Sequence, residues 1–314
     1  MEKNTFPVSA YISAPEDLVH GYLEDLKNLD EWTLFSRMKE QVDENTWIGT
    51  ASAYQNPLYY HIRRNTSGPF KSIEWHCGIK QGEYYQVYPT YLIPPGYIEP
   101  GSKEPGTYFH WVSFVDPARR TAMLGQALDP IHMSECRALK GALERRAGHS
   151  QPAAGQYTVR TVSIYIDAPA DLVVSYLTDL QKVEEWTHRL RRAGEPEASS
   201  GEFLDEYGRK LVVTLRNHPQ PGYSIVEYEG NYAEHRTVER TPILIFPCSY
   251  IFADPAARGV ILHRLTFWNA SNPARGSRRQ IEDFHAENIN IKRLVEAAAG
   301  NLATFALGTS YLLR

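Results

Sequence analysis

The sequence predicts an α+β protein of two tandem domains, each with an antiparallel sheet and a long C-terminal helix. Residues 8–33 and 162–187 are identical at 16 of 26 positions, at an offset of 154. The repeated segment opens each half of a 314-residue chain, a length that suits about two domains. In both halves the hydrophobic period is that of a strand, then of helices, then of several strands, and finally of a helix again.

The first half opens with a strand over Val8–Ser13, where apolar and polar residues alternate. A helix follows from Ala14-Pro15-Glu16-Asp17, because proline suits the first turn and acidic side chains favour a helix N-terminus. Its apolar residues have helical spacing: Leu18, Val19, Tyr22, Leu23 and Leu26. A second short helix is expected over Leu29–Phe35, with Trp32 turned inward.

Strands separated by turn signals are predicted from Lys39 to Asp116. The helical period then returns. Asp129 followed by Pro130 is typical of an N-cap and a first helical position, so we expect the long helix to begin there and to end near Arg146.

The segment 148–156, GHSQPAAGQ, is small, polar and rich in breakers, and it predicts a linker between domains 1–147 and 157–300. The same element order restarts after it, and the last helix is expected over Arg278–Ala299. The apolar tail 301–314 has no counterpart in the first half. It is expected to dock across the domain boundary or onto a second subunit, which leaves a homodimer open.

The composition argues against several classes of protein. A net charge of -4 gives no electrostatic reason to expect a nucleic-acid partner. The odd number of scattered cysteines, Cys77, Cys136 and Cys248, indicates reduced thiols and a cytoplasmic protein. We expect neither a membrane span nor a signal peptide, because the chain has no long apolar run and no leader pattern at its N-terminus.

The repeated motif is strand-Ala-Pro-x-x-Leu-Val-x-x-Tyr-Leu-x-Asp-Leu followed by Glu-Trp-Thr. It resembles the START-like polyketide cyclase/dehydratase superfamily, and its two copies resemble the didomain aromatase/cyclases of that superfamily. The resemblance covers nearly the whole chain and implies two helix-grip domains. In that fold a curved sheet wraps around the last helix and leaves a deep cavity between them.

Two arginine–glutamate sets recur at an offset of 153: Arg63 and Glu74 match Arg216 and Glu227. In the resembled family, a Ser/Thr-x-Arg pair on this strand faces the cavity and handles the poly-β-ketone. Thr214-x-Arg216 keeps that pattern, whereas the first copy has His61 before its arginine. An arginine in an apolar cavity would stabilise an oxyanion. A cross-strand ion pair across each hairpin explains the same residues without catalysis, and both interpretations stay open.

A histidine pair recurs at the same offset, His110 and His263. Each shares a strand face with apolar residues, so that face is expected to be the inner one. A histidine there could act as a general base or could be a hydrogen-bonded core residue.

Aromatic residues are expected to line the substrate cavity: Tyr59, Tyr91, Tyr97, its repeat partner Tyr250, and Phe267, the repeat partner of Phe114. The family often has a pocket tyrosine shortly after the tryptophan helix, but Met38-Lys39 and Arg192-Ala193 stand there instead. No spacing suggests a metal ligand set, a phosphate loop or a Cys-His-Asn nucleophile, so no cofactor is expected.

The resemblance and these residues together predict a cofactor-independent cyclase of natural-product biosynthesis. It would promote the intramolecular aldol-type cyclisation of a poly- or β-ketoacyl substrate. Dehydration or decarboxylation could follow the ring closure, as expected of an aromatase, dehydratase or lyase. Arg216 and Arg63 would hold the oxyanion, His263 and His110 would move protons, and Thr214 would orient a carbonyl. The alternatives are a non-enzymatic carrier of a small hydrophobic ligand and an interaction module.

Overall fold

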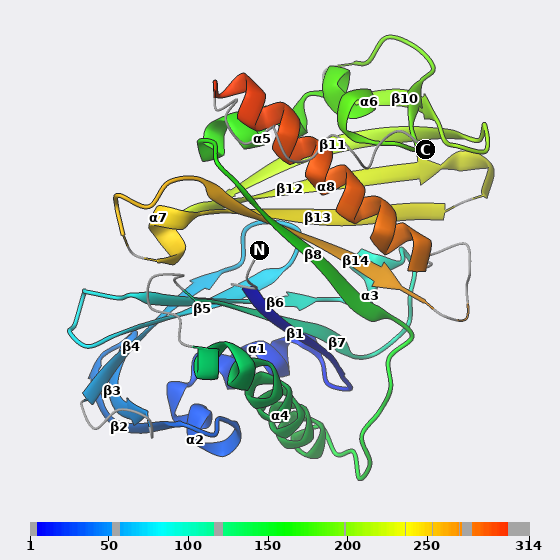
Figure 1. Ribbon diagram of the computed structural model, residues 1–314. Helices are drawn as coiled ribbons and strands as arrows, with labels where there is room; N and C mark the ends of the chain where they lie inside the picture. The colour runs from blue at the N-terminus through cyan, green and yellow to red at the C-terminus, as the bar shows by residue number, and fades with distance from the viewer. Residues whose placement is uncertain are drawn as a thin grey trace. The chain divides into compact units, whose positions relative to one another are not determined.

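The computed structural model describes residues 5–51, 57–115, 122–197, 199–235, 237–252, 254–269, 271 and 278–300, with only the backbone described at 122–126, 235 and 278–280. The chain divides into two compact units, each built on one sheet (Figure 1). The first unit is Met1–Val159 with Ser249–Pro255 and Phe267–Ser271; the second is Arg160–Cys248 with Ala256–Thr266 and Asn272–Arg314. The predicted tandem α+β organisation is confirmed.

The elements of the first unit follow the predicted order. They are β1 Thr5–Ile12, α1 Glu16–Glu24, η1 Leu26–Asn28, α2 Leu29–Trp32, β2 Ser36–Asp43, β3 Thr46–Ala51, β4 Pro57–Asn65, β5 Lys71–Gly78, β6 Gln86–Ile93, α3 Pro95–Ile98, β7 Thr107–Phe114 and α4 Ala122–Arg146.

The second half of the chain repeats this order, although Ser249–Pro255 and Phe267–Ser271 within it belong to the first compact unit. The elements of this half are β8 Thr158–Ile166, α5 Ala170–Thr178, η3 Leu180–Lys182, α6 Val183–Trp186, β9 Arg191–Arg192, β10 Ser200–Leu204, β11 Lys210–Gln220, β12 Tyr223–Tyr232, η4 Ala233–His235, β13 Thr237–Pro247, α7 Cys248–Ile251, β14 Val260–Trp268 and α8 Arg278–Ala298. Residues 148–156 between the repeats contain neither helix nor strand. The exact domain boundaries stay a prediction, and the tail 301–314 lies outside the described residues.

Both sheets have seven strands in the same order, β1-β7-β6-β5-β4-β3-β2 and β8-β14-β13-β12-β11-β10-β9. Consecutive strands pair as antiparallel hairpins, while the opening strand β1 pairs with the last strand β7. In each unit the long helix lies against one face of the sheet (Figure 1). We call this the helix-facing side of the sheet, and the opposite side the outer face.

Element boundaries differ from the prediction in two helices. The second short helix ends at Trp32 rather than at Phe35, because β2 begins at Ser36. The long helix of the first unit begins at Ala122, so Pro130 lies inside it rather than at its first position. A proline inside a helix removes one backbone hydrogen bond and disfavours the preceding turn, but packing of the apolar helix face can outweigh this local preference. The last helix, Arg278–Ala298, matches its predicted range within one residue.

Each long helix is anchored to the opening segment of its unit by a glutamate. The Ser13 backbone N–H donates to Oε1 of Glu144 at 2.9 Å, and the Asp167 N–H donates to Oε1 of Glu296 at 2.7 Å. A lysine one turn earlier, Lys140 or Lys292, pairs with each carboxylate. Since these glutamates match at an offset of 152, both helices take the same register against their sheets.

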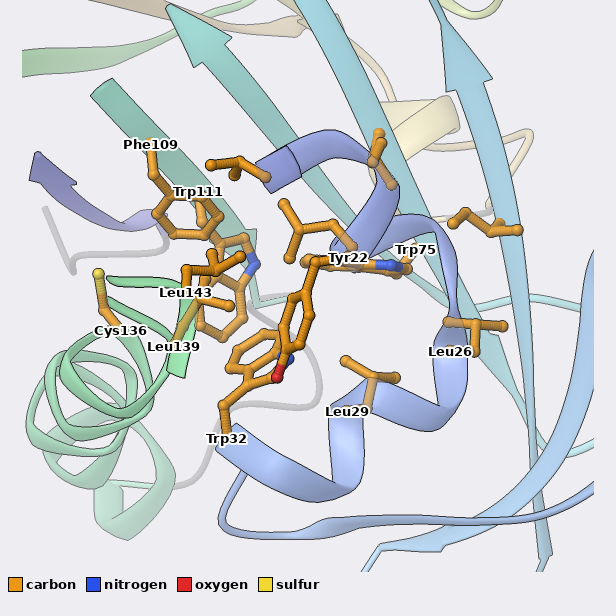
Figure 2. Close-up of a cluster of buried hydrophobic side chains, with 14 of the residues drawn as sticks. Tyr22, Leu26, Leu29, Trp32, Trp75, Phe109, Trp111, Cys136, Leu139 and Leu143 are labelled. Atoms are coloured by element: carbon orange, nitrogen blue, oxygen red, sulfur yellow. The ribbon is translucent and has the colours of Figure 1, made fainter. Parts of the chain in front are cut away.

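The core of each unit lies between the long helix and the sheet. In the first unit the rings of Trp32, Trp75 and Trp111 gather there beside Leu139 and Leu143 of α4 (Figure 2). In the second unit Ile291 and Val295 of α8 occupy the equivalent helix positions. No helix in the described part of the chain is long and apolar enough to cross a membrane.

Candidate functional site

The arginines predicted to face the cavity lie on the outer face of their strands. Leu215 belongs to the core beneath α8, so its neighbour Arg216 points away from that helix. Ile62 belongs to the core beneath α4, and Arg63 therefore also points outward. The predicted inner placement of both arginines was wrong. They are consequently not assigned to catalysis.

The predicted arginine–glutamate pairing is confirmed in the second unit. Nη1 of Arg216 donates to Oε1 of Glu227 at 2.8 Å, and the Arg216 side chain is 43% exposed. Glu229 lies 3.5 Å from the same nitrogen and accepts from Arg240 at 2.8 Å, which extends the pair into a network. A structural cross-strand ion pair was one of the two roles that the sequence left open for Arg216 and Glu227, and this network supports that role.

In the first unit the strand register places Arg63 opposite Glu74, as predicted. Glu74 instead contacts a residue of its own strand: its Oε2 lies 3.0 Å from Nε2 of His76. Arg63 is exposed, and among the described side chains it forms no ion pair with Glu74. The two copies of this pair have therefore diverged.

The two repeated histidines are buried on the outer faces, not on the helix-facing sides. Nδ1 of His110 lies 2.8 Å from Oγ of Ser9, and Nδ1 of His263 lies 2.7 Å from Oγ of Ser163. Burial lowers the pKa of His263 to about 3, so its imidazole is neutral at ordinary pH. These observations support the core-histidine interpretation rather than a general base.

The other predicted strand residues share this outer placement. Five of them lie next to core residues of the helix-facing side: Thr214, Glu227, His61, Tyr59 and Tyr91. Phe267 lies three positions after Arg264, which faces α8, so it points to the opposite side of β14. His61 lies 3.0 Å from the Thr46 hydroxyl, and Tyr91 stacks on His110 with ring centroids 6.2 Å apart. Tyr97 on α3 packs against Phe70, and Tyr250 lies on α7.

A different set of polar residues lies between helix and sheet in the first unit. His132, Glu135 and Leu139 recur on one face of α4 at helical spacing. The His132 ring lies against Trp111 at a centroid distance of 4.4 Å, which shows that this face meets the sheet. Glu135, one turn further along, is only 5% exposed.

The Glu135 carboxylate has one hydrogen bond, from the Leu34 backbone N–H to its Oε1 at 2.8 Å. No cationic side chain pairs with it in the described part of the chain. Burial raises the pKa of Glu135 to about 7, and the hydrogen bond from Leu34 opposes this rise only in part. A carboxyl group with a pKa near neutrality can both accept and return a proton.

A cluster of indole and phenol rings lies in the same interior, and Glu135 is among the groups that, after burial, raise the pKa of Tyr88 in that cluster. Trp111 lies 6.4 Å from Trp75 and 6.1 Å from Tyr88 between ring centroids, and Trp32, two residues before Leu34, lies 5.9 Å from Trp111. Among the described atoms, Nε1 of both Trp75 and Trp111 is buried without a hydrogen-bond partner. The apolar interior of the first unit therefore contains two N–H groups available to donate hydrogen bonds, and a carboxyl that can accept a proton.

The second unit carries an ion cluster at the equivalent place. Nη1 of Arg264 on β14 donates to Oε2 of Glu287 on α8 at 2.6 Å, and both side chains are 2% exposed. Nε of Arg189 lies 3.7 Å from the other oxygen of Glu287. The Phe284 ring contacts both guanidinium groups, at 4.8 Å for Arg264 and 5.1 Å for Arg189.

The two interiors correspond residue by residue. At the helix offset of 152, His132 and Glu135 match Phe284 and Glu287; at the strand offset of 153, Trp111 matches Arg264. The glutamate is thus retained while its neighbour on the last strand changes from an indole to a guanidinium. Among the described side chains, Glu135 has no counter-ion and Glu287 has two.

Comparisons with known proteins place the chain in a family. The model described as "Domain of unknown function (DUF8713)" matches residues 1–152 and again residues 159–304. The chain belongs to this family. It therefore carries two DUF8713 domains in tandem, and a search of curated proteins found no match.

Solved structures similar to this tandem DUF8713 chain include two di-domain ARO/CYC proteins. BexL, from the BE-7585A biosynthetic pathway, is 16% identical with a TM-score of 0.33, over 95% of this chain and 99% of that chain. StfQ, from the steffimycin biosynthetic pathway, is 12% identical with a TM-score of 0.33, over the same shares. DynU16, from the dynemicin biosynthetic locus, is 15% identical with a TM-score of 0.29, over 96% and 98%. Structural similarity at these sequence identities and TM-scores gives no information about the activity of this chain.

Sequence reasoning missed Glu135 and the Arg264 cluster, although a signal was present. The motif Leu139-Lys140-x-x-Leu143-Glu144 matches Ile291-Lys292-x-x-Val295-Glu296 at an offset of 152. Extending that alignment toward the helix N-terminus brings the two buried glutamates into register. A search confined to the offset of 153 passes over them.

Proposed function

We propose that this tandem DUF8713 protein is a cofactor-independent cyclase of poly- or β-ketoacyl compounds in natural-product biosynthesis, with its reaction in the interior of the first unit. The observation that carries the proposal is Glu135: a buried carboxyl with a pKa of about 7, without a counter-ion among the described side chains, on the helix face that meets a sheet surface with two buried, unpartnered indole N–H donors. The repeated opening motif, which resembles the polyketide cyclase superfamily, supports the substrate class.

The proposed reaction needs no co-reactant. The Glu135 carboxylate takes a proton from the carbon between two carbonyl groups, and the C–H electron pair forms an enolate. The enolate carbon attacks a second carbonyl carbon of the same molecule and forms the new C–C bond. The π pair of that carbonyl passes to its oxygen, which takes the proton back from Glu135. Reactant and product are isomers, so protons and electrons balance.

The surrounding groups match this chemistry. The indole N–H groups of Trp75 and Trp111 are buried without a partner among the described atoms and would donate hydrogen bonds to the enolate oxygen, which are stronger where water is excluded. The aromatic walls hold a flexible chain in a folded conformation, which brings the reacting carbons together. At pH 7 Glu135 is divided between its two protonation states, as the two proton transfers require.

The deciding experiment is turnover of candidate β-ketoacyl substrates by Glu135→Gln. Glutamine keeps the shape and the hydrogen bond from Leu34 but cannot take a proton. We expect kcat to fall by roughly a hundred- to ten-thousandfold. The matched control is Glu144→Gln on the same helix, since Glu144 is also buried but pairs with Lys140. The control should lose stability and keep its kcat in the folded protein.

Two outcomes would contradict the proposal. If Glu135→Gln cyclises a substrate as fast as the unaltered protein, this carboxyl is not the base. If the unaltered protein binds ketoacyl compounds and never converts them, the carrier interpretation replaces the cyclase.

A further inference from the structure

The ion cluster of the second unit has donors that its own residues leave unused. The Arg264 guanidinium lies 4.8 Å from the Phe284 ring and 5.6 Å from the Trp186 ring. Its Nη1 donates to Glu287. Its Nε and Nη2 are buried and have no hydrogen-bond partner among the described atoms.

These two nitrogens form one edge of the planar guanidinium group. That edge matches the two oxygens of a carboxylate and can donate two parallel hydrogen bonds. A buried polar edge without a partner is costly, and most buried polar groups in folded proteins are hydrogen-bonded. The geometry of Arg264 is therefore that of a receptor for an anion, and ring stacking does not satisfy donors that lie in the guanidinium plane.

The residues around Arg264 also favour the binding of an anion. Arg189 is a second guanidinium and shares Glu287 with Arg264, so two cations face one carboxylate. The Trp186 indole Nε1 is a further buried donor without a partner among the described atoms. Burial, more than any neighbouring charge, lowers the pKa of Arg264, and Arg189 lowers it further while Glu287 raises it. An incoming anion would relieve this unfavourable environment.

We propose that the interior of the second unit is a binding site for an organic carboxylate with an aromatic or apolar body, held through Nε and Nη2 of Arg264. Trp186 and Phe284 form the apolar walls against which the body of the ligand packs. Arg189, whose side chain is 25% exposed, lies on the side of the cluster nearest the surface and attracts the anion. The site is separate from Glu135 and does not depend on the proposed cyclase activity.

The equivalent described residues of the first unit do not form such a site, which makes the assignment specific. Its position equivalent to Arg264 is Trp111, and the position equivalent to Arg189 is Phe35. Its retained glutamate, Glu135, would repel a carboxylate when charged. The exchange of two apolar residues for two arginines around one glutamate is the change expected when a duplicated interior acquires an anionic ligand.

The test is calorimetric titration of the full chain with 2-naphthoate, and with 2-naphthamide as the uncharged probe of the same shape. We expect 2-naphthoate to bind at least about tenfold more tightly. The double variant Arg264→Met/Glu287→Gln removes both charges at nearly constant volume and should weaken 2-naphthoate by roughly ten- to a hundredfold, the usual effect of losing hydrogen bonds to a charged group. Binding of 2-naphthamide should change little.

Two further variants keep the result interpretable. Arg264→Lys retains the positive charge but lacks the two-nitrogen edge, and it should lose most of the preference for 2-naphthoate. The matched control is Arg216→Met/Glu227→Gln, which removes an arginine–glutamate pair on the outer face of the same sheet and should keep the preference. Equal binding of the two probes, no binding of 2-naphthoate, or a preference that survives in folded Arg264→Met/Glu287→Gln would overturn the assignment.

Discussion

The charge state of Glu135 makes a prediction about stability that does not require a known substrate. Burial raises the pKa of this carboxyl from 4.5 in the unfolded chain to about 7 in the folded protein. Between these values the folded state retains a proton that the unfolded state has released. The free energy of unfolding therefore falls as pH rises through this window, and the effect is absent below it.

The size of the effect follows from the shift. A change from 4.5 to about 7 corresponds to a loss of about 3 kcal/mol when the pH rises from below 4.5 to above 7. Glutamine at this position is uncharged at every pH and retains the hydrogen bond from Leu34. We expect Glu135→Gln to have nearly unaltered stability at pH 4.5 and to be about 3 kcal/mol more stable than the unaltered protein at pH 8.

Urea unfolding of both proteins between pH 4.5 and pH 8 measures this difference. Because two units need not unfold together, the transition of the first unit should be followed through the fluorescence of its clustered tryptophans, Trp32, Trp75 and Trp111. The infrared carbonyl band of a protonated carboxylic acid, lost in Glu135→Gln, reports the titration directly. Stability curves that stay parallel over the whole range would refute the raised pKa and weaken the proposed base.

Two other predictions concern buried charge and buried imidazole. Arg264→Met alone leaves Glu287 buried with only the longer contact of 3.7 Å to Arg189 among the described side chains, and should destabilise the protein by about 3–5 kcal/mol, whereas Arg264→Met/Glu287→Gln should recover most of this loss in thermal unfolding. His263 has a pKa lowered to about 3 in the folded state, so the unfolded state binds its proton first as pH falls from about 6.5. Stability should therefore decrease on acidification by an amount on the order of 4 kcal/mol by pH 3, and His263→Asn should lack this component in acid-unfolding curves. An identical acid response of the two proteins would mean that His263 is protonated in the fold.

The fold could be predicted because its signals are local and repeated. The opening motif fixed two strands and four helices through alternation, first-turn proline and helical spacing, and the repeat supplied the domain count. The helix start was misplaced because Pro130 is a strong local signal, whereas the packing that extends α4 back to Ala122 is tertiary. Local propensity alone cannot weigh the two.

The site could not be predicted in the same way, because strand periodicity distinguishes faces only when one face is solvated. β7 is buried at every position, so the apolar neighbours of His110 do not reveal which side meets the helix. Arg216 shows the converse: its alternation with Leu215 is a correct sign of an outer face, but the resemblance to the Ser/Thr-x-Arg pattern favoured the opposite interpretation. The pairing of Arg216 with Glu227 depended only on register and was predicted correctly.

The contrast between Glu135 and Glu287 is the physical basis for proposing two kinds of chemistry at one duplicated position. Both carboxylates lie on the same face of a long helix, and both helices are held in the same register by Glu144 and Glu296. With Trp111 on the neighbouring strand, the charged carboxylate is poorly solvated and its pKa approaches neutrality, which suits proton transfer. With Arg264 in that place, the carboxylate is held in an ion pair, and the chemistry shifts to the guanidinium edge that remains without a partner among the described atoms. Two exchanges, Trp111 for Arg264 and Phe35 for Arg189, therefore separate the interior that we propose for proton transfer from the interior that we propose for binding an anion.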